Sequence, residues 1–218
     1  LNDIALKTFY EVFERPKLSI VQAGLLILHC RSECPNNWVL CSEIVALSEE
    51  LGLGVDCQDW RLPRWERGLR RRLAWAVWCV DKWCALLESR HSHLILGRNW
   101  MVKLLTEEDF PDKSPIISSS QRNKPASKRP LSPIGNSSIL DISPTDEDFN
   151  NGKLLFRQMV SLSIILGEIM DTFYTIGAMK TTTKIEHVLK LAKPLQLKLR
   201  EWYHSLPHRL SMNNYAPG

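Results

Sequence analysis

The sequence has no apolar run long enough to cross a membrane. The longest candidate, residues 20–29, is interrupted by Gln22 and Gly24, whereas a spanning helix needs about 20 mostly apolar residues. The N-terminus also lacks the charged-then-apolar layout of a secretory signal. Because the chain starts at Leu1 and opens directly into a periodic segment, we interpret it as an internal piece of a longer polypeptide. We expect no membrane partner.

Catalytic motifs are missing as well. The chain contains no phosphate-binding glycine loop, no Gly-x-Ser-x-Gly, no His-Glu-x-x-His and no glycine fingerprint after a strand. The sequence therefore predicts that the chain is not an enzyme, and it offers no catalytic residue and no cofactor-binding residue.

Closely spaced cysteine pairs are also absent. The six cysteines include no two that are separated by only two residues, and their positions suggest no disulfide framework. We expect reduced thiols, as in a cytosolic or nuclear protein. Cys30 and Cys34, with His29 beside them, have a spacing that could hold a metal, but a zinc site needs four ligands and such cysteines are more often small core residues. We predict no metal ligand.

Charge is present but unevenly distributed. The net charge is +4, and much of the excess lies in residues 61–72, where the only acidic residue is Glu66. The basic residues of that segment are Arg61, Arg64, Arg67, Arg70, Arg71 and Arg72. Any interpretation that depends on positive charge must therefore explain this one segment.

Apolar residues recur with the helical period along most of the chain. The periodic segments are residues 4–13, 18–28, 40–51, 69–87, 155–173 and 185–206, and a shorter segment, 95–105, leads to Phe110. Gly52 is placed to end the third segment, and Pro194 to kink or divide the last one. No alternating strand pattern is present. The pattern predicts an all-α, multi-helix domain.

Residues 112–150 differ in composition from the rest. They are rich in Ser, Pro, Lys and Asn and poor in large apolar residues, which is typical of disordered segments. We predict an N-terminal helical part (1–111), a disordered linker (112–150) and a C-terminal helical part (151–218) that packs on the first. Ser114, Ser132 and Ser143 each precede a proline and are candidate phosphorylation sites. An inert tether is the alternative.

The stretch ERGLRRRLAWAVWCVDKW, residues 66–83, mixes arginines with tryptophans. Such a mixture can bind single-stranded nucleic acid. On a helical wheel, however, Trp75 and Trp78 lie opposite the apolar stripe, so the helix is apolar nearly all round and belongs in a core. Asp81 would then be buried and would need a partner from another element, because Arg72 lies too far back along the helix.

The arginines have acidic neighbours within reach. Arg70 follows Glu66 by one helical turn, and Asp56 and Asp59 lie in the preceding connector. We favour a structural role for these arginines over nucleic-acid contacts, because carboxylates near a core require partners and guanidinium suits them best.

The central stretch resembles the fungal-specific transcription factor domain, the middle homology region of zinc-cluster (Zn2Cys6) activators. The resemblance rests on a Leu-Gly-Leu turn, a Glu-arginine-aromatic-Asp series and a later Leu-x-x-Trp-x-x-x-Leu-Pro element. The matching residues here are Gly52, Glu66, Arg70, Arg71, Arg72, Trp75, Trp78, Asp81, Trp202 and Pro207. The chain departs from the pattern at Gly54, where the family has His, and at Ser89, where the family has the Gly of Gly-Arg-Pro.

The resemblance implies a regulatory domain of a nuclear transcription factor that acts through other transcription factors or coactivators, or through a small-metabolite effector. Asp81-Lys82-Trp83 and residues 107–111 resemble the activators that control use of GABA, urea and allantoin as nitrogen sources. The zinc and the DNA contacts of such proteins would lie in a zinc-cluster domain that this chain lacks. A direct nucleic-acid-binding module using Arg61–Arg72 and an unrelated helical metabolite-binding protein are the alternatives.

Overall fold

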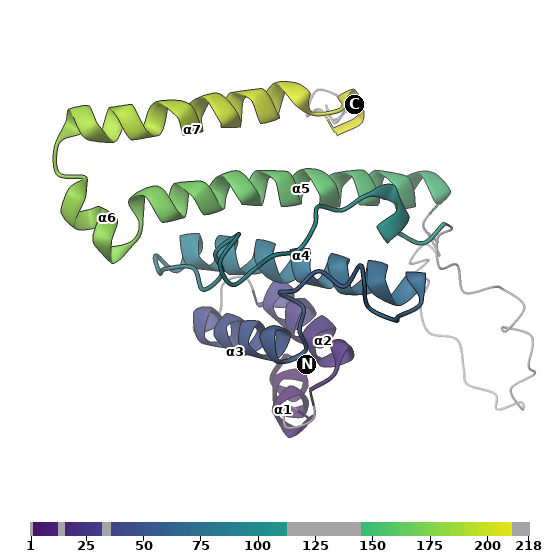
Figure 1. Ribbon diagram of the computed structural model, residues 1–218. Coiled ribbons are helices and arrows are strands. Elements are labelled where there is room, and N and C mark those ends of the chain that lie inside the picture. The colour runs from purple at the N-terminus through teal and green to yellow at the C-terminus, as the bar shows by residue number, and fades with distance from the viewer. Residues whose placement is uncertain (1, 13–15, 32–35, 113–144, 211–218) are drawn as a thin grey trace, which may run out of the picture.

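A computed structural model describes residues 2–12, 16–31, 36–112 and 145–210 (Figure 1). These residues form seven α-helices and no strand, although two isolated β-bridges join Val55 to Met101 and Leu96 to Trp100. The all-α prediction is confirmed. The helices are α1 (Asn2–Val12), α2 (Leu18–Cys30), α3 (Asn37–Glu50), α4 (Arg64–Leu87), α5 (Asp146–Phe173), α6 (Ile176–Thr181) and α7 (Ile185–Ser205). None of them combines the length and the apolar content that crossing a bilayer requires.

Helix α4 lies at the centre of the fold. Figure 1 shows α5 along one side of it and α2 and α3 along the other. Its buried residues lie around most of its circumference: Gly68, Leu73, Ala74, Trp75, Val77, Trp78, Cys79, Asp81, Lys82 and Ala85. The expectation that this helix is apolar nearly all round, and hence a core element, agrees with this burial.

The chain leaves α3 through a glycine turn. Leu53 N–H donates to Ser48 C=O and Gly52 N–H donates to Glu49 C=O, at 2.9 Å each, which is the Schellman pattern of a helix C-terminus. Gly52 has φ of 69°, a left-handed conformation that glycine adopts without a steric cost. The sequence-based prediction that Gly52 ends this helix therefore agrees with the structure.

Helix α5 begins earlier than the sequence suggested. We expected the linker to run to Asn150, but Asp146 is already helical. The Thr145 hydroxyl accepts from Asp148 N–H at 3.1 Å, and the Asp148 carboxylate accepts from Thr145 N–H at 2.9 Å. This capping box satisfies helix N–H groups that would otherwise lack partners. The acidic residues that looked like the end of a linker are thus the first turn of a helix.

Helix α7 forms an outer layer on α5, on the side away from α4, and the short helix α6 connects the two at one end (Figure 1). The Trp202 indole donates to Gln158 C=O at 3.3 Å, and Lys198 pairs with Glu168 at 2.5 Å. α7 runs through Pro194 without dividing in two. Pro207 follows its C-terminus, where Leu210 N–H donates to the Pro207 carbonyl at 2.8 Å and closes a 3-10 turn, η3 (His208–Leu210).

Candidate functional site

Arg71 is the centre of the arginine cluster. Its guanidinium forms ion pairs with Asp56 and Asp109, with N–O distances of 2.9 Å each. Asp56 lies in the connector before α4, and Asp109 lies in a short 3-10 helix, η1 (Glu107–Asp109), far along the chain. One side chain of α4 thereby ties two irregular segments to the core helix.

Both carboxylates of this cluster are fully bonded. Asp56 accepts N–H groups from Gln58 at 2.8 Å and from Lys103 at 2.9 Å, while Asp109 accepts the N–H of Thr106 at 2.9 Å. Burial raises the pKa of Asp56, but the hydrogen bonds from Arg71, Lys103 and Gln58 outweigh burial, so its pKa lies below the ordinary value. Both groups are committed to holding the backbone in place.

The other two signature arginines bind backbone carbonyls. Arg70 pairs with Glu66 at 3.3 Å and donates to Leu51 C=O at 3.1 Å, which satisfies an acceptor at the C-terminus of α3. Arg72 donates to Asp109 C=O and lies over the Phe110 ring. Gly68 makes this second contact possible, because a Cβ there would lie 2.6 Å from the Asp109 carbonyl oxygen.

The tryptophans of the signature fill the core. Trp75 and Trp78 are each 1% exposed and pack edge to face, with ring centroids 6.1 Å apart. The Trp75 indole N–H donates to Lys103 C=O at 2.8 Å. Neither ring is accessible for stacking on a base, because both are enclosed by other elements.

Asp81, which is 1% exposed, is the centre of a second cluster. Its carboxylate accepts N–H groups from His93 at 2.9 Å and Leu94 at 3.1 Å, and the Ser92 hydroxyl at 2.6 Å. The prediction that another element supplies its partners agrees with this arrangement. Burial raises the pKa of Asp81, yet the bonds from His93 and Ser92 and the charge of Lys82 lower it to about 2.

Lys82 is the residue that sequence reasoning missed. It is completely buried, pairs with Asp81 at 3.2 Å and also donates to Ser92 Oγ and Leu94 C=O. Its ammonium lies 3.9 Å from the centre of the Trp78 ring. A lysine directly after an aspartate looks like an ordinary exposed pair, so no local signal indicated burial.

Asp109 was quoted for the resemblance, but its pairing with Arg71 was not foreseen. Thr106 and Asp109 have the Ser/Thr-x-x-Asp/Glu spacing of a capping box, and the structure forms that box at η1. This spacing is the signal that could have marked the turn, although it does not reveal the pairing with Arg71.

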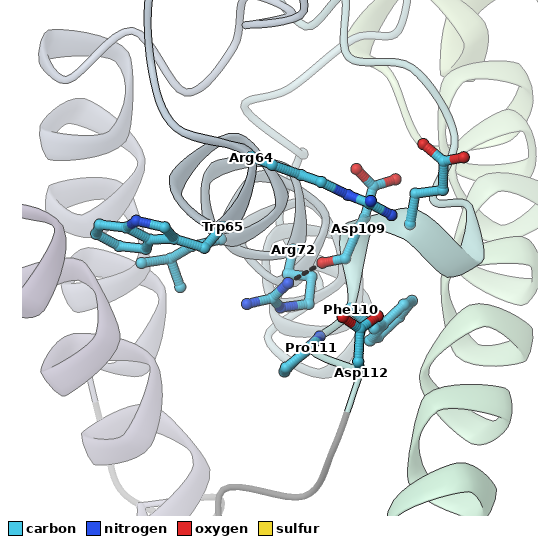
Figure 2. Close-up of a pocket in the computed structure, with 9 residues that line it drawn as sticks. Arg64, Trp65, Arg72, Asp109, Phe110, Pro111 and Asp112 are labelled. Carbon is cyan, nitrogen blue, oxygen red and sulfur yellow. Dashed lines mark hydrogen bonds between the residues drawn. The ribbon is translucent and has the colours of Figure 1, made fainter.

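Two cavities adjoin the arginine cluster. One, of about 510 Å³, is lined by Trp65, Leu69, Phe110 and Pro111 together with Arg64, Arg72 and three carboxylates. The other, of about 660 Å³, lies on the polar side, over Arg67, Arg71 and Lys103. Figure 2 shows Arg72 bonded to Asp109, with Trp65 pointing away from that pair. Because both signs of charge line these cavities, neither is built for an anion alone.

The remaining predicted residues fall into two groups. Glu66 lies in the first turn of α4, whereas Trp202 and Pro207 belong to the outer layer around α7, so the signature does not converge on one site. Ser114, Ser132 and Ser143 lie outside the described residues, as does Cys34. Within the described part of the chain no group of three or more His, Cys, Asp or Glu side chains is arranged to hold a metal.

Comparison with known proteins gives the same classification as the signature. The fungal specific transcription factor domain matches residues 2–204. The transcriptional activator protein DAL81 of Saccharomyces cerevisiae is 66% identical over 226 residues, which cover 100% of this chain and 23% of that protein. An uncharacterized transcriptional regulatory protein of Schizosaccharomyces pombe is 28% identical over 176 residues, which cover 79% of this chain and 22% of that protein.

The chain thus spans less than a quarter of the length of these relatives. No solved structure matches it at a significant level. The domain match covers nearly the whole chain, and it includes both the arginine cluster and the Asp81 cluster. The chain therefore belongs to the fungal specific transcription factor domain family.

Proposed function

We propose that this chain is the regulatory domain of a nuclear transcriptional activator, without enzymatic activity, and that it controls RNA polymerase II transcription of metabolic genes. The observation that carries the proposal is the use of the arginine signature: Arg70, Arg71 and Arg72 all bind acceptors within the domain. The three arginines therefore stabilise the fold of the domain. A regulatory body of this kind transmits input from partner proteins or a small effector to the activator.

The genes under control are nitrogen-utilisation genes. This part of the proposal is supported by the resemblance of residues 81–83 and 107–111 to the activators for GABA, urea and allantoin use, and by the high identity to the transcriptional activator DAL81. DNA is contacted only through a zinc-cluster domain elsewhere in the polypeptide. Phosphorylation of Ser114, Ser132 or Ser143 is a further mode of control, and intact-mass measurement of native protein checks it.

A reporter assay tests the regulatory proposal. The chain is inserted between an unrelated DNA-binding domain and a strong activation domain, and reporter transcript is measured in cells grown on ammonium or on GABA. Insertion is expected to make the transcript depend on the nitrogen source. Arg71→Ala, which disconnects Asp56 and Asp109, is expected to remove that dependence, whereas substitution of the exposed Arg98 serves as the control. Equal transcript with and without the chain on both nitrogen sources would overturn the proposal.

Direct nucleic-acid binding is the second candidate, because one observation favours it. Arg61 and Arg64 are exposed, and Trp65 beside them is 68% exposed, so a basic and aromatic edge remains accessible. Fluorescence anisotropy of the chain with single- and double-stranded DNA, across a salt series, separates the two functions. We expect no binding at low micromolar concentration near physiological salt. Tight, steeply salt-dependent binding that is lost in Arg64→Ala would favour the second candidate.

A further inference from the structure

Four helices meet around a small cavity at the C-terminal end of α4. The cavity, of about 200 Å³, is lined by residues of α2, α3, α4 and α5. Its walls include the apolar side chains of Leu28, Val80 and Trp83, and the exposed side chains of Leu87 and Met159 lie at its opening. It shares no lining residue with the two cavities beside the arginine cluster, so it is a separate feature of the fold.

The interior of this cavity is apolar and uncharged. The Trp83 indole N–H is already bonded to Ser163 Oγ at 3.0 Å, so Trp83 offers the cavity only its ring. Burial raises the pKa of Cys79, another lining residue, to about 11, so that thiol is neutral near pH 7. His29 and Glu88 also line the cavity, but both are exposed and therefore lie at the rim. The interior suits a neutral, mainly apolar molecule, because a charged one would lose its hydration there.

One buried polar atom of the lining has no partner. Asn37, the first residue of α3, lines the cavity and is 7% exposed. Its Nδ2 donates to Arg31 C=O at 2.6 Å, which settles the orientation of the amide, because an amide oxygen cannot bond to a carbonyl oxygen. The other end, Oδ1, is buried and accepts no hydrogen bond from the described residues. Buried acceptors are satisfied in the great majority of cases, so this oxygen indicates a donor from outside the chain.

The size and lining of the cavity limit what that donor belongs to. An apolar cavity of about 150 Å³ holds benzene, so a volume of about 200 Å³ accommodates a slightly larger ring system such as indole. A buried water molecule would need about two to four polar partners, whereas the described residues place only the Asn37 amide away from the rim as a strong hydrogen-bonding group. An aromatic ring packs favourably against Trp83, edge to face or offset. The lining therefore matches a neutral aromatic molecule with one donor.

We propose that the cavity between α2, α3, α4 and α5 is a binding site for a small, neutral aromatic molecule whose N–H or O–H group donates to Asn37 Oδ1. The apolar walls enclose the ring, and the ligand enters past Leu87 and Met159. This inference goes beyond the proposed function, because binding at the cavity does not depend on which genes the domain controls. Since the site exists only where the four helices are packed together, the ligand binds the folded chain and stabilises it.

Isothermal titration calorimetry of the native chain with indole and with benzofuran tests the proposal. The two molecules have the same fused-ring shape, but benzofuran has an oxygen in place of the N–H group. Indole is expected to bind at least about fivefold more tightly, because one neutral hydrogen bond contributes a factor of about that size. Asn37→Leu is expected to bind both with equal affinity. Failure of the native chain to bind either molecule would overturn the site, and equal binding of the two would overturn the role of Asn37.

A cavity-filling variant locates the bound molecule. Val80→Phe is expected to abolish binding of both molecules, whereas Val39→Phe, the same change at a 49% exposed position of α3 outside the cavity, is expected to bind like the native chain. Indole is also expected to raise the Tm of the native chain and of Val39→Phe but not that of Val80→Phe. Undiminished binding in Val80→Phe would place the ligand elsewhere and overturn the proposal. If circular dichroism shows Val80→Phe to be unfolded, the comparison of native chain and Asn37→Leu still decides.

Discussion

At the scale of single residues, the ionic groups of α4 set its position in the fold. Asp81 and Lys82 are both fully buried and share Ser92 and Leu94 as hydrogen-bond partners. A buried ion pair adds little net stability, but removal of one partner leaves the other charge uncompensated. The pair therefore makes the fold sensitive to substitution at either position.

Asp81→Asn is expected to lower the free energy of unfolding by about 3–5 kcal/mol, because the Lys82 ammonium then remains buried without a counter-ion. Adding Lys82→Met is expected to recover part of the loss. Lys198→Met, which breaks the exposed pair with Glu168, is the control and is expected to cost less than about 1 kcal/mol. Urea unfolding measures all four proteins, and a double variant no more stable than Asp81→Asn would contradict the ion-pair explanation.

The same carboxylate predicts an acid limb in the stability profile. Its pKa falls from 3.8 to about 2 on folding, so its contribution is complete above the unfolded value and is lost as the pH falls through the folded value. The shift corresponds to about 2 kcal/mol. Urea unfolding between pH 5 and pH 2 is expected to show a shallower decline in Asp81→Asn/Lys82→Met than in the native chain. Parallel declines would mean that other groups cause the acid limb.

Ser89 occupies a position that favours glycine. After α4, Arg90 N–H donates to Ala85 C=O at 2.9 Å and Ser89 N–H to Leu86 C=O at 3.3 Å, which repeats the helix ending at Gly52. Ser89 has φ of 52°, a strained conformation for a residue with a Cβ. The turn thus places a serine in a left-handed conformation at the position where the family's Gly-Arg-Pro has glycine.

Ser89→Gly is therefore expected to raise the free energy of unfolding by about 1 kcal/mol. The reciprocal change, Gly52→Ser, is expected to lower it by at least that amount, since its Cβ would also lie 3.1 Å from the Trp60 ring. Thermal unfolding followed by circular dichroism compares the two variants. A destabilised Ser89→Gly would show that the serine side chain contributes more than its backbone strain costs.

At the scale of elements, α5 packs directly against α4. The Trp83 indole donates to Ser163 Oγ at 3.0 Å, and Gly167 lies over Trp78 and Lys82. A Cβ at Gly167 would be 3.1 Å from the Trp78 ring and 3.2 Å from Lys82 Cε, whereas a Cβ at Gly152 on the same helix would meet nothing within 4 Å. The two glycines thus have opposite consequences on substitution.

Gly167→Ala is expected to destabilise the chain by about 1–3 kcal/mol through overpacking. Gly152→Ala is expected to stabilise it by up to about 1 kcal/mol, because alanine favours a helix and the site is open. The midpoint of urea unfolding checks both. Equal effects of the two substitutions would show that α5 does not press on α4 at Gly167.

At the scale of the whole molecule, the fold has a tightly packed centre and a thin outer layer. Ten residues of α4 are buried, but Leu195 is the single buried residue of α7. Ile185, Leu189 and Tyr203 of α7 are each more than 60% exposed. Local stability follows buried contacts, so the free energy of local unfolding should be higher for α4 than for α7.

Amide hydrogen exchange is expected to be slowest in α4 and much faster in α6 and α7. The reason is that opening α7 exposes little apolar surface, whereas opening α4 exposes two tryptophans. Exchange measured by mass spectrometry at peptide resolution checks this. Equal protection of α4 and α7 would indicate that the outer layer unfolds only together with the core.

The sequence by itself determined the all-helical class, the glycine turn at Gly52, the core position of the tryptophan helix and the family, because helical periodicity and turn chemistry are local properties. It suggested that Arg70 pairs with Glu66 and that the arginines reach Asp56 or Asp59 of the connector, without saying which arginine binds which carboxylate. The sequence-based prediction placed the end of the linker at Asn150, which is too late, because the acidic residues from Asp146 onward form the first turn of α5. Only the tertiary structure decided that Lys82 is buried and that Asp109 returns to Arg71. Both features depend on residues from separate elements, and a local sequence pattern does not indicate which elements pack together.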